Sequence, residues 1–114
     1  MSILKILQII AIIGTIGTGL VSLFWPQSVF GFTGLTAPGP RGITEIRSIL
    51  GALFIGLGIA VFLLGTRQVY QMLGIMYLAI GVVRAVSMLV DKSIEQSNII
   101  SLVIELVFGF ILVF

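Results

Sequence analysis

Four long apolar stretches, separated by short polar or Gly/Pro-containing breaks, limit what this chain can fold into more than any other feature. Each stretch approaches the ~20 residues that a helix needs to cross ~30 Å of hydrocarbon. The chain is 59% hydrophobic and 9% charged, with a mean hydropathy of +1.30, whereas about a quarter of the residues in an ordinary globular domain are charged. The sequence therefore predicts an all-α integral membrane protein.

The breaks between the apolar stretches determine the expected topology. The spans are predicted at about residues 6–25, 40–64, 68–90 and 97–114. Residues 27–39 form the one long connection, and its apolar side chains indicate a segment that lies in the membrane interface. Because short connections place consecutive helices side by side in opposite directions, we predict a single domain, residues 1–114, folded as a four-helix bundle made of two antiparallel hairpins.

Residues at the span ends carry local signals. Pro40 is expected as the first residue of the second span, where the N–H group that proline lacks has no helical partner anyway. Ser93 and Gln96 have the spacing of a capping box, which predicts the beginning of the fourth span.

Two residue types that carry much of protein chemistry are missing, because the chain contains no cysteine and no histidine. This excludes disulfides, thiolate zinc sites, iron–sulfur clusters, histidine-ligated haem or zinc, and a Ser-His-Asp triad. No metal site, cofactor or catalytic residue is therefore expected. The net charge of +2 includes no basic stripe, so the lipid bilayer is an expected partner and nucleic acid is not.

Polar side chains recur on one face of each of the last two spans. The third span has Arg84, Ser87 and Asp91 at positions i, i+3 and i+7, and the fourth repeats this spacing with Asn98, Ser101 and Glu105. Because the two spans are expected to run in opposite directions, these stripes should face each other. The predicted contacts are Arg84 with Glu105, Ser87 with Ser101, and Asp91 with Asn98.

Depth in the membrane brings further charges to the same level. Arg84 lies seven residues before Asp91 and Arg47 seven after Pro40, so each is expected ~10 Å in from the same membrane face. The charges predict a polar pocket in one half of the bundle. Its candidate residues, as a ligand-binding site or polar cluster, are Glu45, Arg47, Arg84, Ser87, Asp91 and Glu105.

Two interpretations of these charges stay open on the sequence alone. A buried Arg84–Glu105 pair either fixes the register of the helices or handles a ligand or a proton. Glu45 has a simpler alternative of its own, an i, i+4 ion pair with Arg41 on one helix.

Three short motifs follow one another along the last three spans. They are Glu45-Ile46-Arg47 with Gly51, Arg84-x-x-Ser87-x-x-x-Asp91, and Glu105-Leu106. In their order and spacing they resemble DUF4345, a family of small four-span bacterial membrane proteins of unknown function. The resemblance covers about residues 40–110, with Lys92 standing where glycine is expected after the aspartate. It implies a bacterial inner membrane location and no particular activity.

Three classes of function fit these residues. The first is a binding or assembly protein, which holds a lipid-like or small amphipathic ligand or associates as a homo-oligomer or as a subunit of a membrane complex. The second is a proton- or ion-coupled carrier that uses Glu105. The third is a membrane enzyme acting on lipid or quinone with Glu45 or Asp91 as general base. We favour a non-enzymatic role, because the sequence offers no nucleophile–base pair.

Overall fold

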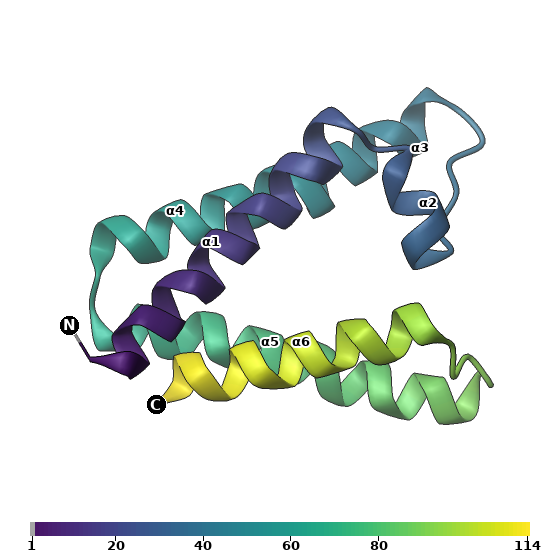
Figure 1. Ribbon diagram of the computed structural model, residues 1–114. Helices are drawn as coiled ribbons and strands as arrows, with labels where there is room; N and C mark the ends of the chain where they lie inside the picture. The colour runs from purple at the N-terminus through teal and green to yellow at the C-terminus, as the bar shows by residue number, and fades with distance from the viewer. Residues whose placement is uncertain (1) are drawn as a thin grey trace. The chain divides into compact units, whose positions relative to one another are not determined.

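The computed structural model describes residues 2–114, and every regular element among them is helical. In chain order the elements are α1 (Ile3–Phe24), α2 (Ser28–Thr33), α3 (Pro40–Glu45), η1 (Ile46–Ala52), α4 (Leu53–Leu64), α5 (Arg67–Val90) and α6 (Gln96–Val113). The elements α3, η1 and α4 form one continuous helical segment (Figure 1). Within it, η1 is π-helical. The predicted all-α class is confirmed.

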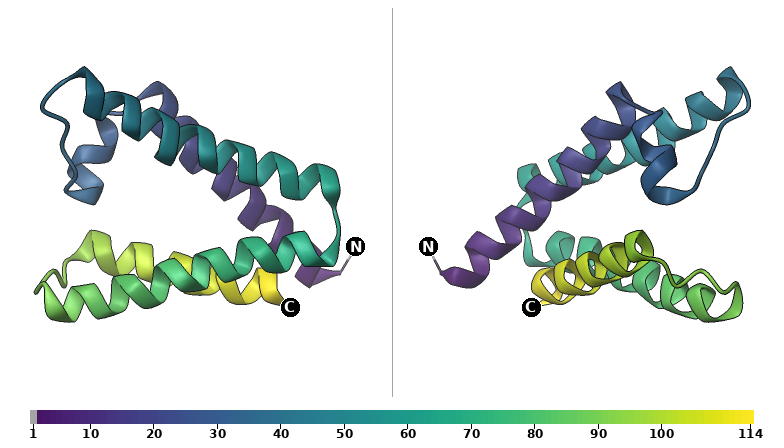
Figure 2. Two further views of the ribbon diagram at one scale, coloured as in Figure 1. Left: turned by 180° about the vertical axis from the view of Figure 1, so that it is seen from behind. Right: turned by 45° about the vertical axis from the view of Figure 1, so that its right-hand side comes forward.

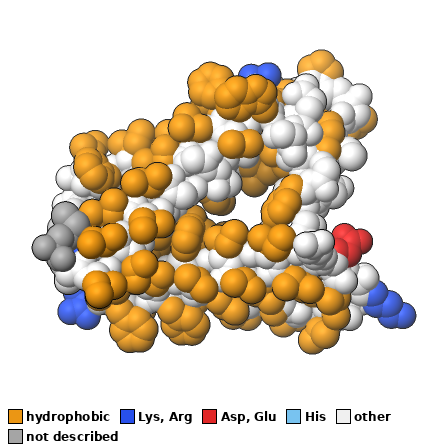
Figure 3. Space-filling model, viewed as in Figure 1, with side chains coloured by type: hydrophobic (Ala, Val, Ile, Leu, Met, Phe, Trp, Pro, Cys, Tyr) orange, Lys and Arg blue, Asp and Glu red, His pale blue; other side chains and the backbone are white. Residues whose placement is uncertain are grey.

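Helical segments of membrane-spanning length account for most of the described chain. Four segments among residues 2–114 are long and apolar enough to cross a membrane: Ile3–Phe24, Pro40–Leu64, Arg67–Val90 and Gln96–Val113. Hydrophobic side chains cover much of the surface of these helices (Figure 3), and residues such as Leu63 and Leu89 are 75% and 72% exposed. Lipid is the solvent that such surfaces require. The protein is therefore a multi-pass membrane protein.

The chain divides into two compact units. The first contains α5, α6 and the beginning of α1 up to Ala11, and the second contains residues Ile12–Leu64. Within the first unit, α5 and α6 lie side by side in every view (Figures 1 and 2). The single domain and the bundle of two antiparallel hairpins stay predictions.

Glycine brings the backbones of α5 and α6 into direct contact. A Cβ atom at Gly74 would lie 2.9 Å from the carbonyl oxygen of Gly109, and one at Gly109 would lie 2.5 Å from Leu78. Tyr77 packs edge-on against Phe108, with ring centroids 5.5 Å apart. Along this interface, residues with higher numbers in α5 contact residues with lower numbers in α6. Close backbone approach supplies the packing that holds helices together in lipid, where the hydrophobic effect contributes little.

The last turn of α6 receives hydrogen bonds from two glutamines of the same unit. Gln8 of α1 donates an Nε2–H to the carbonyl oxygen of Ile111 at 3.1 Å, and Gln71 of α5 donates to that of Val113 at 3.3 Å. The final carbonyl groups of a helix have no intrahelical partner, and leaving one unbonded in hydrocarbon is unfavourable. The two glutamines therefore fasten the end of α6 to its neighbours.

Glycine also mediates packing in the second unit, where α1 lies against η1 and α4. A Cβ atom at Gly19 would lie 2.6 Å from the carbonyl oxygen of Gly51, and one at Gly58 would lie 2.4 Å from Ile16. Gly51 belongs to η1, so the π-helical segment is one of the parts of the second span that pack closely against α1. π-helical segments are rare and commonly interrupt α-helices at specialised positions.

The helix ends agree with some of the local signals and not with others. Pro40 is the first residue of α3, as predicted, and the Thr66 side chain accepts a hydrogen bond from the backbone N–H of Val69 at the beginning of α5. The predicted capping box of Ser93 with Gln96 is wrong. A capping box needs Ser93 as the N-cap, but α6 begins at Gln96 and its N-cap is Glu95, which makes no side-chain cap. The backbone N–H of Ser93 donates instead to Met88 at the end of α5.

Lys92 adopts the left-handed conformation that ends α5. Its φ of 53° is the only positive value at a non-glycine residue among residues 2–114. The N–H of Ser93 donates to the carbonyl oxygen of Met88 at 3.1 Å, which is the 6→1 hydrogen bond of a Schellman motif. Glycine usually occupies this position, because a Cβ atom is strained there. It is also the residue that the family motif led us to expect.

The substitution Lys92→Gly should stabilise the protein, because it removes the Cβ atom from the left-handed position. We expect a gain of about 1 kcal/mol in the free energy of unfolding, measured by titrating the protein in mixed micelles with sodium dodecyl sulfate. Lys92→Ala is the control, since it removes the charge and keeps the strain. Equal stability of the glycine and alanine variants would contradict the assignment of strain to Lys92.

The substitution Gly74→Ala should destabilise the first unit, because the new methyl group meets the backbone of α6. We expect a loss of about 1–3 kcal/mol by the same unfolding titration, as is typical of overpacked contacts. Gly56→Ala is the matched control within a helix, since a Cβ atom at Gly56 meets nothing within 4 Å. It should be neutral or slightly stabilising. Similar losses for both variants would show that helix packing at Gly74 is not the cause.

Candidate functional site

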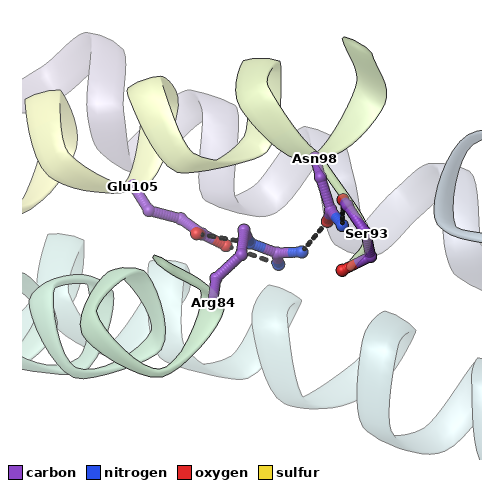
Figure 4. A network of polar contacts seen from close by, with 4 residues as sticks. All are labelled: Arg84, Ser93, Asn98 and Glu105. Atoms are coloured by element: carbon purple, nitrogen blue, oxygen red, sulfur yellow. Dashed lines mark hydrogen bonds and ion pairs between the residues drawn. The ribbon is translucent and has the colours of Figure 1, made fainter. Parts of the chain in front are cut away.

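A bidentate ion pair joins the C-terminal half of α5 to the middle of α6. The guanidinium of Arg84 donates through Nε to Oε1 of Glu105 at 2.7 Å and through Nη2 to Oε2 at 2.8 Å (Figure 4). Glu105 is only 8% exposed, whereas Arg84 is half-buried. The predicted contact between these two residues inside the membrane spans is confirmed. Each charge supplies the partner that the other needs at this depth.

Asn98 extends the ion pair toward the connection between the two helices. Its Oδ1 accepts a hydrogen bond from Nη1 of Arg84 at 2.9 Å, and its Nδ2 donates to the carbonyl oxygen of Ser93 at 2.9 Å (Figure 4). The side chain thus links the first turn of α6 to the guanidinium and to the loop that precedes α6. Three of the five N–H groups of Arg84 are used in this network.

The outer contacts of the predicted stripes are wrong. Ser87 donates its hydroxyl hydrogen to Oδ2 of Asp91 on its own helix at 2.6 Å, and Asn98 bonds to Arg84 rather than to Asp91. No hydrogen bond between Ser87 and Ser101 is present within residues 2–114.

Packing contacts align the two helices along this interface. Gly74 meets the backbone of Gly109, and a Cβ atom at Gly81 would lie 3.1 Å from Leu106. The long side chain of Arg84 reaches Glu105 from its own helix. The same guanidinium takes Oδ1 of Asn98 as its third acceptor.

The other two predicted site residues bond within the second unit. Glu45 forms an ion pair with Arg41, four residues earlier on the same helix, and both side chains are exposed. Arg47 of η1 donates through Nη1 to the carbonyl oxygen of Leu23 at 3.0 Å, near the C-terminal end of α1, where carbonyl groups favour a cation. Of the six predicted residues, the structure brings Arg84 together with Glu105 and Ser87 with Asp91. The gathering of all the charges in one cluster stays a prediction.

An open pocket of about 490 Å³ lies beside the ion pair. It is lined by Ala79, Ile80, Val83, Arg84, Ser87 and Asn98. The polar stripes do not indicate the apolar side of this pocket, and Asn98 was not among the predicted site residues. The spacing of Ile80, Val83 and Ser87 (i, i+3, i+7), next to Arg84, marks one face of a helix and was a usable signal.

The pocket can offer hydrogen-bond donors beside an apolar wall. Two N–H groups of Arg84 and one of Asn98 remain outside the network just described. Ala79, Ile80 and Val83 supply the apolar side. Within residues 2–114, no three acidic side chains gather in a group that could hold a metal ion. The arrangement is suited to holding an amphipathic molecule by its polar end.

Comparison with known proteins identifies a family. Residues 3–114 match the family described as "Domain of unknown function (DUF4345)". The chain belongs to the DUF4345 family. The match covers nearly its whole length, further than the motifs in the last three spans indicated. No curated protein and no solved structure matches the chain.

A double-mutant cycle on the ion pair should reveal strong coupling. Removing one partner, in Arg84→Ala or Glu105→Ala, leaves a buried charge and should cost about 3–5 kcal/mol in unfolding free energy. The double variant should lose much less than the sum of the two, because it leaves neither charge behind. Detergent unfolding of all four proteins measures this. Additive or negligible effects would show that the pair does not hold α5 to α6.

Proposed function

We propose that this DUF4345 protein resides in the bacterial inner membrane and binds a small amphipathic or lipid-like molecule in the pocket beside Arg84. The observation that carries the proposal is the half-buried guanidinium, which is held in place by Glu105 and Asn98 and lines a pocket with an apolar wall. A polar group at the edge of an apolar pocket is the usual pattern of sites for such ligands.

The geometry supports binding because the polar groups are already oriented. Arg84 is restrained at both ends of its guanidinium, by Glu105 on one side and Asn98 on the other. A ligand would therefore not have to order a flexible side chain, which normally weakens binding. The lining residues of α5 extend over about 12 Å along the helix axis, from Ala79 to Ser87, long enough for a short hydrocarbon chain.

A proton-coupled carrier has less support from the same residues. Glu105 would have to exchange protons during transport, and both of its carboxylate oxygens accept hydrogen bonds from Arg84. Protonating Glu105 would leave Arg84 as an unpaired charge within the membrane, which is unfavourable. The binding proposal requires no such break.

Filling the pocket should expel any molecule that the protein retains during purification. Val83 lines the pocket and is 68% exposed, so Val83→Trp should block the site without disturbing the core. Native mass spectrometry of protein extracted from bacterial membranes should show a bound small molecule on the wild type, and the variant should lose most of that signal.

Val82→Trp is the matched control for this experiment. Val82 is the preceding residue, is 60% exposed, and does not line the pocket. It should keep the bound molecule, because its side chain leaves α5 in another direction. Binding that is absent from the wild type, or lost equally in both variants, would contradict the proposal. A wild-type protein that carries only a second copy of the chain would favour assembly over ligand binding.

A further inference from the structure

We infer that the ligand of this pocket is electrically neutral and presents a carbonyl oxygen at the end of an apolar chain. This inference rests on the proposed function, because it assigns a chemical class to the molecule that the pocket holds. It follows from the charge balance of the pocket, from the hydrogen-bonding groups left free in it, and from the placement of its apolar side chains.

Charge balance argues against an ionic ligand. The positive charge of Arg84 is already matched by Glu105, with both guanidinium–carboxylate bonds shorter than 3 Å. The nearest further charge along α5 is Asp91, which accepts a hydrogen bond from Ser87 and takes part in no ion pair within residues 2–114. An anionic ligand would be repelled by two carboxylates and would also lose its hydration. The electrostatic surroundings therefore favour a neutral molecule.

The free hydrogen-bonding groups call for an acceptor atom. Arg84 retains two N–H groups and Asn98 retains one, whereas a guanidinium has no acceptor to offer. The Ser87 hydroxyl hydrogen already goes to Asp91. A ligand whose polar end carries only donors, such as an alkylammonium ion, would leave these N–H groups without partners. A carbonyl oxygen can accept from them with no charge of its own.

The apolar wall defines the rest of the ligand. Ala79, Ile80 and Val83 precede Arg84 along α5, on the side away from Asp91. A molecule with its carbonyl oxygen at Arg84 would therefore lay its hydrocarbon part toward Ala79, deeper in the span. Esters, ketones and quinones with an alkyl tail share this chemistry, and so do the ester groups of neutral glycerolipids.

Three probes built on a ten-carbon chain test the choice of head group. Methyl decanoate is neutral with a carbonyl oxygen, decanoate is an anion, and decylamine is a cation. We expect methyl decanoate to bind about tenfold more tightly than either ion, which is the difference that one hydrogen bond from a charged donor contributes. Isothermal titration calorimetry in dodecyl maltoside, a detergent without a carbonyl group, measures all three. Dioctanoylglycerol, as a fourth probe, distinguishes an ester within a lipid from a free ester.

The pocket variants separate failure of this inference from failure of the proposed function. Val83→Trp should weaken methyl decanoate binding by about tenfold or more, and Val82→Trp should leave it unchanged. Tighter or equal binding of decanoate or decylamine that is still lost in Val83→Trp would overturn the neutral carbonyl ligand and support the pocket itself. If no probe binds, or if Val83→Trp has no effect on any, the pocket is not a ligand site and both proposals fail.

Discussion

A guanidinium and a carboxylate inside hydrocarbon cannot be separated without leaving a bare charge, and this constraint governs the α5–α6 unit. Arg84 and Glu105 meet through two short hydrogen bonds, so the two helices have one favourable register at this level. Gly74 and Gly109 permit the same register by allowing backbone contact further along. The polar and the steric contacts agree, which is how a sequence specifies one packing arrangement.

The same ion pair shapes what the pocket can do. Because Glu105 neutralises Arg84, the pocket exposes donor groups without a net charge to attract ions. Asn98 holds the other edge of the guanidinium and connects it to Ser93, so the donors are rigidly placed. The structural and the functional interpretations of the pair are therefore compatible. The Arg84–Glu105 pair holds α5 against α6, and the same guanidinium serves as an oriented hydrogen-bonding group.

Predictions from the sequence succeeded where any other arrangement would expose backbone groups or unpaired charges to lipid. Apolar stretches of spanning length had to be membrane helices, and Arg84 and Glu105 had to find partners. They failed where small differences in packing decide. The spacing of polar residues did not reveal that Asn98 would bond to Arg84 rather than to Asp91, or that Ser87 would bond to Asp91 on its own helix. The capping signal at Ser93 likewise did not reveal that the backbone N–H of Ser93 bonds to Met88 at the end of α5.

Solid-state NMR in lipid bilayers can detect the Arg84–Glu105 ion pair and its response to a bound ester. The sample carries ¹⁵N-labelled arginine, ¹³C-labelled glutamate and the substitution Arg41→Gln, which removes the other arginine–glutamate pair within residues 2–114. We expect dipolar coupling between the guanidinium nitrogens of Arg84 and the carboxyl carbon of Glu105. Adding methyl decanoate should preserve that coupling and shift the Arg84 nitrogen signals. Coupling that is absent, or that disappears when the ester binds, would contradict this expectation.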